Sequence, residues 1–231
     1  MRNVVLIILD SCRYDSFHRA KAPFLKSFGK VHKCYSVACW TIPSLTSLAF
    51  GIPPLNSPIR ANLFNVKNFK QKQILTPNPL VISERTRIFK GFNVKGLKYD
   101  YLRSSASIFK DAEQFLEQAE EPFYLLMLLM ETHAPFWDGK KTYGHPRIFR
   151  TVEEGVSVQA RCVEHIDQNF KKYLYDSLTS LKNTRVIITA DHGEGMGDEG
   201  EYGRTFHHNL TQQDIYFHPK LFEIPFIIKD L

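Results

Sequence analysis

The sequence VIITADHGEG, residues 186–195, joins a β-branched apolar run to an acid, an imidazole and glycines. Near-continuous apolar runs of this kind are typical of strands buried on both faces, as in parallel sheets covered by helices. Asp191 and His192 follow the run at once, where such a strand would leave the core. We therefore expect a buried strand over 184–191 that ends in two side chains able to bind a metal ion.

Further apolar runs predict more strands of the same sheet, at 3–10, 122–131 and 223–230. The leucine and methionine content of 122–131 also permits a helix there. A weaker run at 92–100 predicts another strand. The chain therefore has enough buried strands to form a central sheet.

Helical patterns lie between these runs. Apolar residues recur at helical spacing in 105–121 and in 156–178, which predicts a helix in each segment. The proline-rich segment 52–82 and the segment 136–154 are typical of irregular loops. Strands that alternate with helices imply an α/β fold with helices layered on a mainly parallel sheet.

Composition narrows the class of protein. The chain of 231 residues suits one domain, 1–231, better than two, and its hydrophobic fraction of 43% is ordinary for a globular protein. The net charge of +6 comes without a block of like charges, which argues against nucleic-acid binding and is compatible with an anionic substrate. The four cysteines form no C-x-x-C pair, so we expect free, mostly buried thiols.

Targeting signals are not evident in the sequence. No apolar run reaches the roughly 18–20 residues of a membrane span. The first predicted strand begins directly after Met1 and Arg2, with no leader peptide ahead of it. We therefore expect a cytoplasmic protein.

Two predicted strands end in carboxylates, the first at Asp10 and the other at Asp191, beside His192. In open parallel sheets the carboxyl ends of the strands meet at the edge where ligands bind. Two acids placed there repel each other unless a cation lies between them. Mixed oxygen and imidazole ligands suit Zn²⁺ or Mn²⁺, whereas Ca²⁺ and Mg²⁺ prefer oxygen alone. The alternative is that each aspartate caps a helix.

The segment CWTIPSLTSLAFG, residues 39–51, predicts a helix with Pro43 in its first turn and Gly51 at its end. Thr41 lies just ahead of the helix N-terminus, where free N–H groups and the helix dipole favour a phosphoryl or sulfuryl group. Metal coordination would lower the pKa of the threonine hydroxyl and make it a nucleophile. The alternative is that Thr41 or Ser44 only caps the helix.

The segments VVLIILDSCRYDSF, CWTIPSLTSLAFG, METHAPF and VIITADHGEGMGDEG, with the later FHHN and IPFIIK, follow the order seen in the alkaline phosphatase superfamily. They most resemble its sulfatase-like branch, which includes sulfatases, phosphonate and phosphodiester hydrolases, and phosphoglycerol and phosphoethanolamine transferases. The resemblance runs from Asn3 to Lys229. It implies a three-layer α/β/α sandwich with a mainly parallel central sheet, as one minimal catalytic domain without a C-terminal subdomain.

The resemblance also implies roles for individual residues. Asp10, Asp191 and His192 match the ligands of a divalent metal, and Thr41 matches a nucleophile bound to that metal. His133, in THAP, resembles the histidine that binds the transferred group or assists the leaving group. These residues form the expected catalytic centre.

Other positions of the pattern point to substrate binding or to a second metal ion. His207 or His208, before Asn209, resembles a late histidine with such a role. Glu131 is a weaker candidate for the same site. Arg13 matches a recurring arginine of the first loop, with a structural role as the alternative. One or two metal ions are therefore expected.

Departures from the sulfatase pattern favour phosphoryl over sulfate chemistry. Sulfatases carry a Cys or Ser, converted to formylglycine, where this chain has Thr41, and Leu45 replaces the arginine of that motif. Cys39 lies two residues too early to take this place. Ser11 stands where sulfatases tend to have a second acid.

We therefore expect a metal-dependent hydrolase or transferase of phosphate mono- or diesters that works through Thr41 and a covalent phospho-enzyme. Its substrate would be a small or anionic phosphate ester, and no oligomeric state is predicted. One alternative is a sulfatase that works without formylglycine. Another is a relative that binds a ligand without catalysis.

Overall fold

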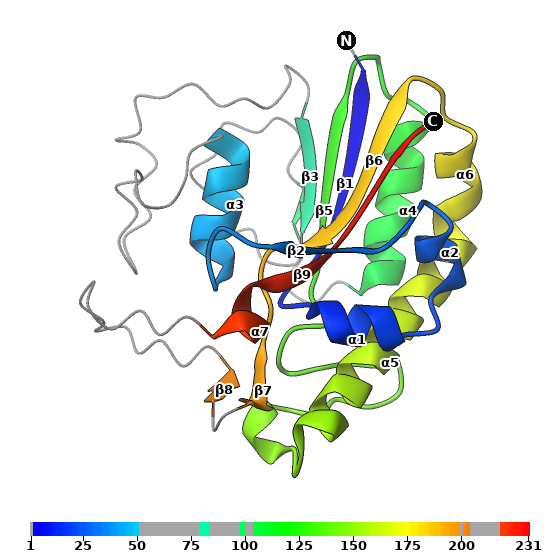
Figure 1. Cartoon of the computed structure of the whole chain (residues 1–231). Helices are drawn as coiled ribbons and strands as arrows, with labels where there is room; N and C mark the ends of the chain where they lie inside the picture. The colour runs from blue at the N-terminus through cyan, green and yellow to red at the C-terminus, as the bar shows by residue number, and fades with distance from the viewer. Residues whose placement is uncertain (1, 51–78, 84–97, 100–103, 199–200, 204–217) are drawn as a thin grey trace.

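The computed structural model describes residues 2–50, 79–83, 98–99, 104–198, 201–203 and 218–231 (Figure 1). Its central element is a seven-stranded sheet with the strand order β2-β9-β6-β1-β5-β3-β4. Helices cover this sheet on both sides, which gives the three-layer α/β/α arrangement and confirms the predicted fold class.

The middle of the sheet consists of three parallel strands, β1 (Asn3–Leu9), β5 (Tyr124–Leu129) and β6 (Thr184–Ala190). Leu6 of β1 lies level with Leu126 of β5 and with Ile187 of β6. The predicted apolar runs form these strands because helices cover both faces of the sheet. The run at 122–131 is thus a strand and not a helix.

The outer strands complete the sheet. On one side β3 (Pro79–Ser83) pairs parallel with β5, and β4 (Lys98–Tyr99) pairs parallel with β3. On the other side β9 (Glu223–Asp230) runs antiparallel between β6 and β2 (His32–Tyr35). The sheet is therefore mainly parallel, as predicted.

The strand β3 corrects one sequence prediction. The segment 52–82 was expected to be irregular because it is rich in proline, yet its end forms a strand that begins at Pro79. Proline has no N–H to give to a ladder, but it is tolerated as the first residue of a strand. The rest of this segment, up to residue 78, lies outside the described residues, as do residues 92–97 of the weak run at 92–100.

One helical layer contains α4 (Ser105–Leu116), α5 (Val152–Tyr173) and α6 (Tyr175–Thr179), with α1 (Tyr14–Arg19) and α2 (Pro23–Lys26) packed against α5. Figure 1 shows α3 (Thr41–Phe50) on the opposite side of the sheet. The short elements η4 (Pro146–Ile148) and α7 (Pro219–Phe222) precede α5 and β9. A separate hairpin pairs β7 (Gly195–Asp198) with β8 (Glu201–Gly203).

The helix α5 starts earlier than its apolar pattern predicted, at Val152 instead of 156. Thr151 supplies the reason, because its hydroxyl accepts a hydrogen bond from the Glu154 N–H (3.1 Å) and caps the helix. The end of α4 also differs from the prediction, because the helix stops at Leu116 and does not extend to residue 121. Propensity and periodicity locate such helices better than they locate their ends.

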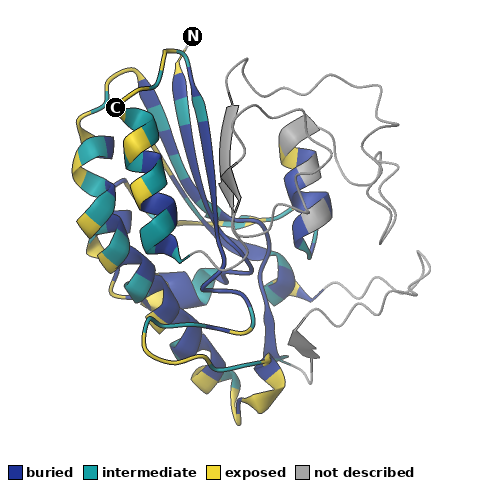
Figure 2. Cartoon of the chain, turned by 180° about the vertical axis from the view of Figure 1, so that it is seen from behind, coloured by how far each residue is buried: buried dark blue, intermediate teal, exposed yellow. Residues whose placement is uncertain are grey.

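The main core lies between the sheet and this helical layer. The apolar stripe of α5 and α6 faces the sheet, and Figure 2 shows the buried sides of these helices turned inward. The predicted residues of the stripe are all buried: Val163, Ile166, Phe170, Leu174 and Leu178. All four cysteines are free, and three of them are buried, as predicted. Within the described part of the chain, no helix combines the length and apolar character of a membrane span.

Candidate metal and nucleophile site

The carboxyl ends of β1, β5 and β6 meet at one edge of the sheet, as expected for a topological switch point. Asp10 follows β1, and Asp191 and His192 follow β6. The ligand atoms of these three buried residues all lie within 4.8 Å of one another. The predicted proximity of these three residues is therefore confirmed by the structure.

The two carboxylates provide a test of whether a cation fits between them. Burial, and then the nearby charge of Asp10, raise the pKa of Asp191 well above its usual range. Asp191 Oδ1 accepts hydrogen bonds from the N–H groups of Ser11 (3.1 Å) and His192 (3.0 Å). Its Oδ2 is buried and accepts no hydrogen bond from any described residue. A divalent cation would satisfy this oxygen and offset the repulsion, so the residues fit a metal site.

The ring of His192 is held in the tautomer that a metal ligand needs. Its Nδ1 lies 2.6 Å from the carbonyl oxygen of Gly193, which only accepts hydrogen bonds. Nδ1 therefore carries the proton, and the Nε2 lone pair is directed toward the acids, 3.7 Å from Asp10 Oδ1. A backbone carbonyl that fixes the second ring nitrogen is a frequent feature of metal-binding histidines.

Thr41 is the first residue of α3 and is only 2% exposed. Its Oγ1 lies 3.3 Å from Asp10 Oδ2 and 3.3 Å from His192 Nε2. The helix predicted within the segment 39–51 thus forms with Pro43 in its first turn, but it already includes Thr41, which was expected just ahead of it; Gly51 lies outside the described residues. The hydroxyl lies beside the residues that could hold a metal ion and at a helix N-terminus, where N–H groups favour an anion.

Ser11 contributes to the site in a way that the sequence did not reveal. It is fully buried, and its φ of +61° is a left-handed conformation that serine adopts only at some cost. This conformation directs its N–H to Asp191, while its hydroxyl donates to Asp10 Oδ1 at 2.8 Å. Ser11 thereby orients both carboxylates.

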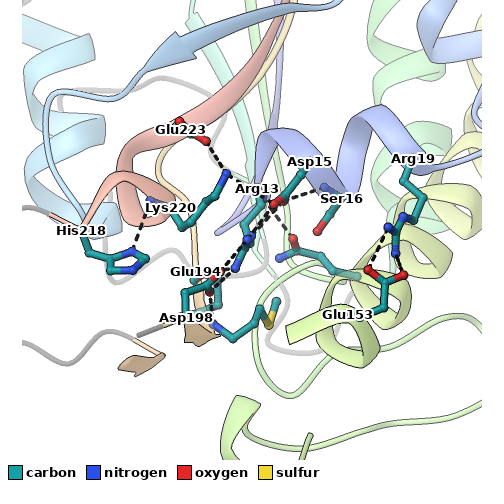
Figure 3. Close-up of polar contacts among 12 residues, drawn as sticks. Arg13, Asp15, Ser16, Arg19, Glu153, Glu194, Asp198, His218, Lys220 and Glu223 are labelled. Carbon is teal, nitrogen blue, oxygen red and sulfur yellow. Dashed lines mark hydrogen bonds and ion pairs between the residues drawn. The ribbon is translucent and has the colours of Figure 1, made fainter. Parts of the chain in front are cut away.

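Arg13 is engaged within the protein at every donor. Its guanidinium bonds both carboxylate oxygens of Asp15 (2.9 and 2.7 Å) and of Asp198 (2.5 and 3.1 Å), and also the Glu194 carbonyl (3.2 Å), as Figure 3 shows. These five bonds use all five N–H groups of the side chain. This geometry favours the structural alternative for Arg13, which ties the loop after β1 to β7.

The remaining predicted residues lie at different places. His133 is buried in the loop after β5, and its Nδ1 donates to the Ala134 carbonyl, which leaves Nε2 as its acceptor. Glu131 accepts a hydrogen bond from the Ser105 N–H (2.6 Å) at the start of α4. Among the described residues Glu131 does not join the group that could hold a metal. His207 and His208 lie outside the described residues.

Comparisons with known proteins place this site in a family. The model of the family described as Sulfatase matches residues 2–230, so the chain belongs to the sulfatase family, in the sulfatase-like branch of the alkaline phosphatase superfamily. A curated relative, the low-salt glycan biosynthesis sulfotransferase Agl7 of Haloferax volcanii, is 27% identical over 96% of this chain and 53% of its own length. The chain therefore spans about half the length of that relative.

Solved structures share the fold at low sequence identity. The C-terminal periplasmic domain of phosphoethanolamine transferase EptC from Campylobacter jejuni is 13% identical, with a TM-score of 0.70 over 98% of this chain and 78% of that one. The phosphonate monoester hydrolase of Agrobacterium radiobacter is 13% identical, with a TM-score of 0.66 over 100% of this chain and 68% of that one. The C-terminal periplasmic domain of EcEptC from Escherichia coli in complex with Zn is 14% identical, with a TM-score of 0.65 over 99% of this chain and 72% of that one.

Proposed function

We propose that this protein is a metal-dependent hydrolase or transferase of phosphate esters, with Thr41 as its nucleophile. One observation carries the proposal, namely the position of Thr41 Oγ1 at the N-terminus of α3, 3.3 Å from both Asp10 and His192. A hydroxyl that only capped the helix would have no need of two buried carboxylates and an imidazole beside it.

The residues that would hold the metal are Asp10, Asp191, His192 and the Thr41 hydroxyl. A bound divalent cation lowers the pKa of a hydroxyl and offsets the charge of the carboxylates and of the substrate. The mixed oxygen and nitrogen donors favour Zn²⁺ or Mn²⁺ over Ca²⁺ or Mg²⁺. The solved structure of EcEptC with Zn, which shares this fold, agrees with zinc.

The chain's own groups supply the steps of group transfer. Thr41 Oγ1 attacks phosphorus as its proton passes toward Asp10 Oδ2, so that the O–P bond to Thr41 forms while the bond to the leaving oxygen breaks. His133, after its Nε2 has taken up a proton from solvent, donates that proton to the leaving oxygen. Water or an acceptor hydroxyl then attacks phosphorus as its proton passes to His133 Nε2, and the O–P bond to Thr41 breaks while Thr41 Oγ1 recovers its proton from Asp10 Oδ2. The N–H groups of the first turn of α3 stabilise the charge on the phosphoryl oxygens.

The first test compares wild type with Thr41→Ala after loading with Zn²⁺ or Mn²⁺. The substrates are nitrophenyl esters: a phosphate monoester, a phosphate diester, a phosphonate monoester and a sulfate. We expect turnover of at least one phosphorus ester, reduced at least 10³-fold in Thr41→Ala, because the covalent route is lost. Thr179→Ala, at the exposed end of α6, is the matched control and should keep wild-type rates.

Wild-type rates in Thr41→Ala would refute Thr41 as the nucleophile. A protein that binds neither ion and turns over none of the four esters would instead support a relative that binds a ligand without catalysis. Metal content is measured on the same samples, so these two results are told apart.

A second candidate function is the transfer or hydrolysis of a sulfuryl group. The observation that favours it is the 27% identity with a relative named as a sulfotransferase. Against it, Leu45 occupies the position of the motif arginine and is buried in the protein interior, where it offers no charge to a sulfate. Thr41-dependent preference for the sulfate ester in the same panel would favour this second function over the first.

A further inference from the structure

Gln159 is a fully buried glutamine in the middle of α5. Glutamine is mostly found at protein surfaces, and a buried amide is costly unless its hydrogen-bonding groups are satisfied. The side chain lies on the face of α5 that approaches the carboxyl ends of β1 and β5, since its partners belong to the loops after these two strands. A polar residue at this place therefore needs an explanation.

All the hydrogen bonds of the Gln159 amide go to backbone groups of those two loops. Nε2 donates to the carbonyl oxygens of Ser11 (2.9 Å) and Thr132 (2.9 Å), and Oε1 accepts from the Arg13 N–H (3.1 Å). The orientation of the amide is fixed, because carbonyl oxygens only accept and a backbone N–H only donates. One side chain thus joins the loop after β1 to the loop after β5.

These loops carry the residues of the proposed active centre. Ser11 follows Asp10 directly and holds its left-handed conformation while it bonds both carboxylates of the site. Thr132 precedes His133, and its hydroxyl donates to the Asp10 carbonyl oxygen at 2.7 Å. A strained conformation such as that of Ser11 persists only where its surroundings determine it fully.

We propose that Gln159 is a positioning residue that sets the metal ligands and His133 relative to each other. It acts through the backbone of Ser11 and Thr132 and touches neither metal nor substrate. The inference rests on the proposed function, because it assumes that the site binds a metal ion. Glutamate could not donate to two carbonyl groups, and asparagine would fall one methylene short, so the chemistry of the position selects glutamine.

The test measures metal affinity directly. The dissociation constant for Zn²⁺ is determined by competition with a chromophoric chelator for wild type, Gln159→Met and Gln159→Asn, with Asp191→Asn as the background for adventitious zinc. We expect Gln159→Met to weaken Zn²⁺ binding 10- to 100-fold, as is usual when an outer partner of a metal site is removed. In Gln159→Asn the loss of Zn²⁺ affinity should be smaller. The asparagine amide is one methylene short of making all three hydrogen bonds, but it can keep some of them, whereas methionine keeps none.

Turnover provides a second measurement. With the ester preferred by wild type, at saturating Zn²⁺, we expect kcat of Gln159→Met to fall 10- to 100-fold with little change in KM, because the reacting groups are displaced and not removed. Ile166→Val is the matched control. It lies on the same helix and is equally buried, and the change removes one methyl group from the main hydrophobic core. It should lower the melting temperature while leaving the Zn²⁺ affinity and kcat unchanged.

The outcomes separate this inference from the proposed function. If wild type binds Zn²⁺ and Gln159→Met binds it equally well, Gln159 is not a positioning residue and the proposed function stands. If Ile166→Val weakens binding as much as Gln159→Met, general loss of stability explains the effect and the inference is wrong. If wild type binds neither Zn²⁺ nor Mn²⁺ above the Asp191→Asn background, both the inference and the metal-dependent function are wrong. Should Gln159→Met not fold, Gln159→Asn decides between these results.

Discussion

The absence of a side chain at Gly193 allows the loop after β6 to lie directly against α7. A Cβ at this position would stand 2.0 Å from the Lys220 carbonyl oxygen, and the Gly193 N–H donates to the Leu221 carbonyl at 2.8 Å. The contact is with backbone, which cannot turn aside as a side chain can. The loop that carries Asp191 and His192 is therefore fixed by its neighbour as well as by its own strand.

Gly193→Ala should destabilise the protein by about 1–3 kcal/mol and weaken Zn²⁺ binding, because α7 or the loop must move to admit the methyl group. Urea unfolding and zinc titration measure the two effects. Gly155→Ala is the control, since the nearest atoms that its Cβ would meet belong to the side chains of Met196 and Phe149. Equal effects of the two substitutions would show that the backbone contact of Gly193 has no special importance.

At the scale of elements, α2 depends on a residue of α5 for its cap. Ala22 offers no side chain to cap α2, and the Leu25 N–H in its first turn donates instead to Asp167 Oδ1 at 2.7 Å. Burial raises the pKa of Asp167 to about 6, with a smaller contribution from Glu164, while backbone N–H groups and Lys26 act in the opposite direction. The cap therefore carries a charge that the folded protein tolerates poorly.

The free energy of unfolding should respond to pH through Asp167. The folded state holds this proton more tightly than the unfolded state, whose carboxyl titrates near 4, so stability from this group declines as pH rises from about 4 to about 6. Asp167→Asn keeps the acceptor oxygen without the charge. Relative to wild type it should gain roughly 1–3 kcal/mol between pH 4 and 7, because one unit of pKa corresponds to about 1.4 kcal/mol.

Urea unfolding of both proteins at several pH values measures this difference. Glu164→Gln, one turn away on α5, is a control that also removes a negative charge but leaves the cap intact. A difference between wild type and Asp167→Asn that stays constant from pH 4 to 7 would contradict the role given to Asp167.

For the whole molecule, metal binding should appear as thermal stability. A ligand at 100 times its dissociation constant adds about 2.7 kcal/mol, which corresponds to about 5–10 °C in the melting temperature of a protein of this size. Zn²⁺ should produce this rise in wild type. Asp191→Asn should lose the rise, and without metal it should melt above metal-free wild type, because one of two repelling buried carboxylates has become neutral.

Differential scanning calorimetry with and without Zn²⁺ measures both effects. His18→Ala removes an exposed histidine and should keep the rise, which controls for zinc bound at the surface. A metal-free Asp191→Asn protein less stable than metal-free wild type would show that the carboxylates do not strain the fold.

Much of the fold was predictable because burial on both faces leaves a strong signal in sequence. The runs that form β1 and β5 are almost entirely apolar, and those of β6 and β9 are apolar at their centres. The order of these runs with the helices indicated a layered α/β fold. The edge strand β2 was not predicted, because it is short and mostly exposed. The strand β3 was missed because proline dominates the segment before it.

Only part of the site was predictable. Asp10, Asp191 and His192 come directly after apolar strands, so their proximity followed from topology, whereas their roles as ligands, and that of Thr41 as nucleophile, stay predictions. Gln159 shows what was missed. It lies four residues before Val163 on the apolar stripe of α5, and a polar residue on such a stripe is the signal that could have revealed it. Its partners are backbone groups, which leave no mark in sequence.

The position of β9 between β6 and β2 has a consequence for synthesis on the ribosome. The strand β2 is made early, but its partner is residues 223–230, so at about 5–20 residues per second it waits roughly 10–40 s for that partner. Once β6 is made, its edge stays open until β9 follows roughly 40 residues later, for about 2–8 s at the same rate, and it can pair with other chains during that time. We therefore expect the nascent polypeptide, and not the finished molecule, to be the form that requires protection by chaperones.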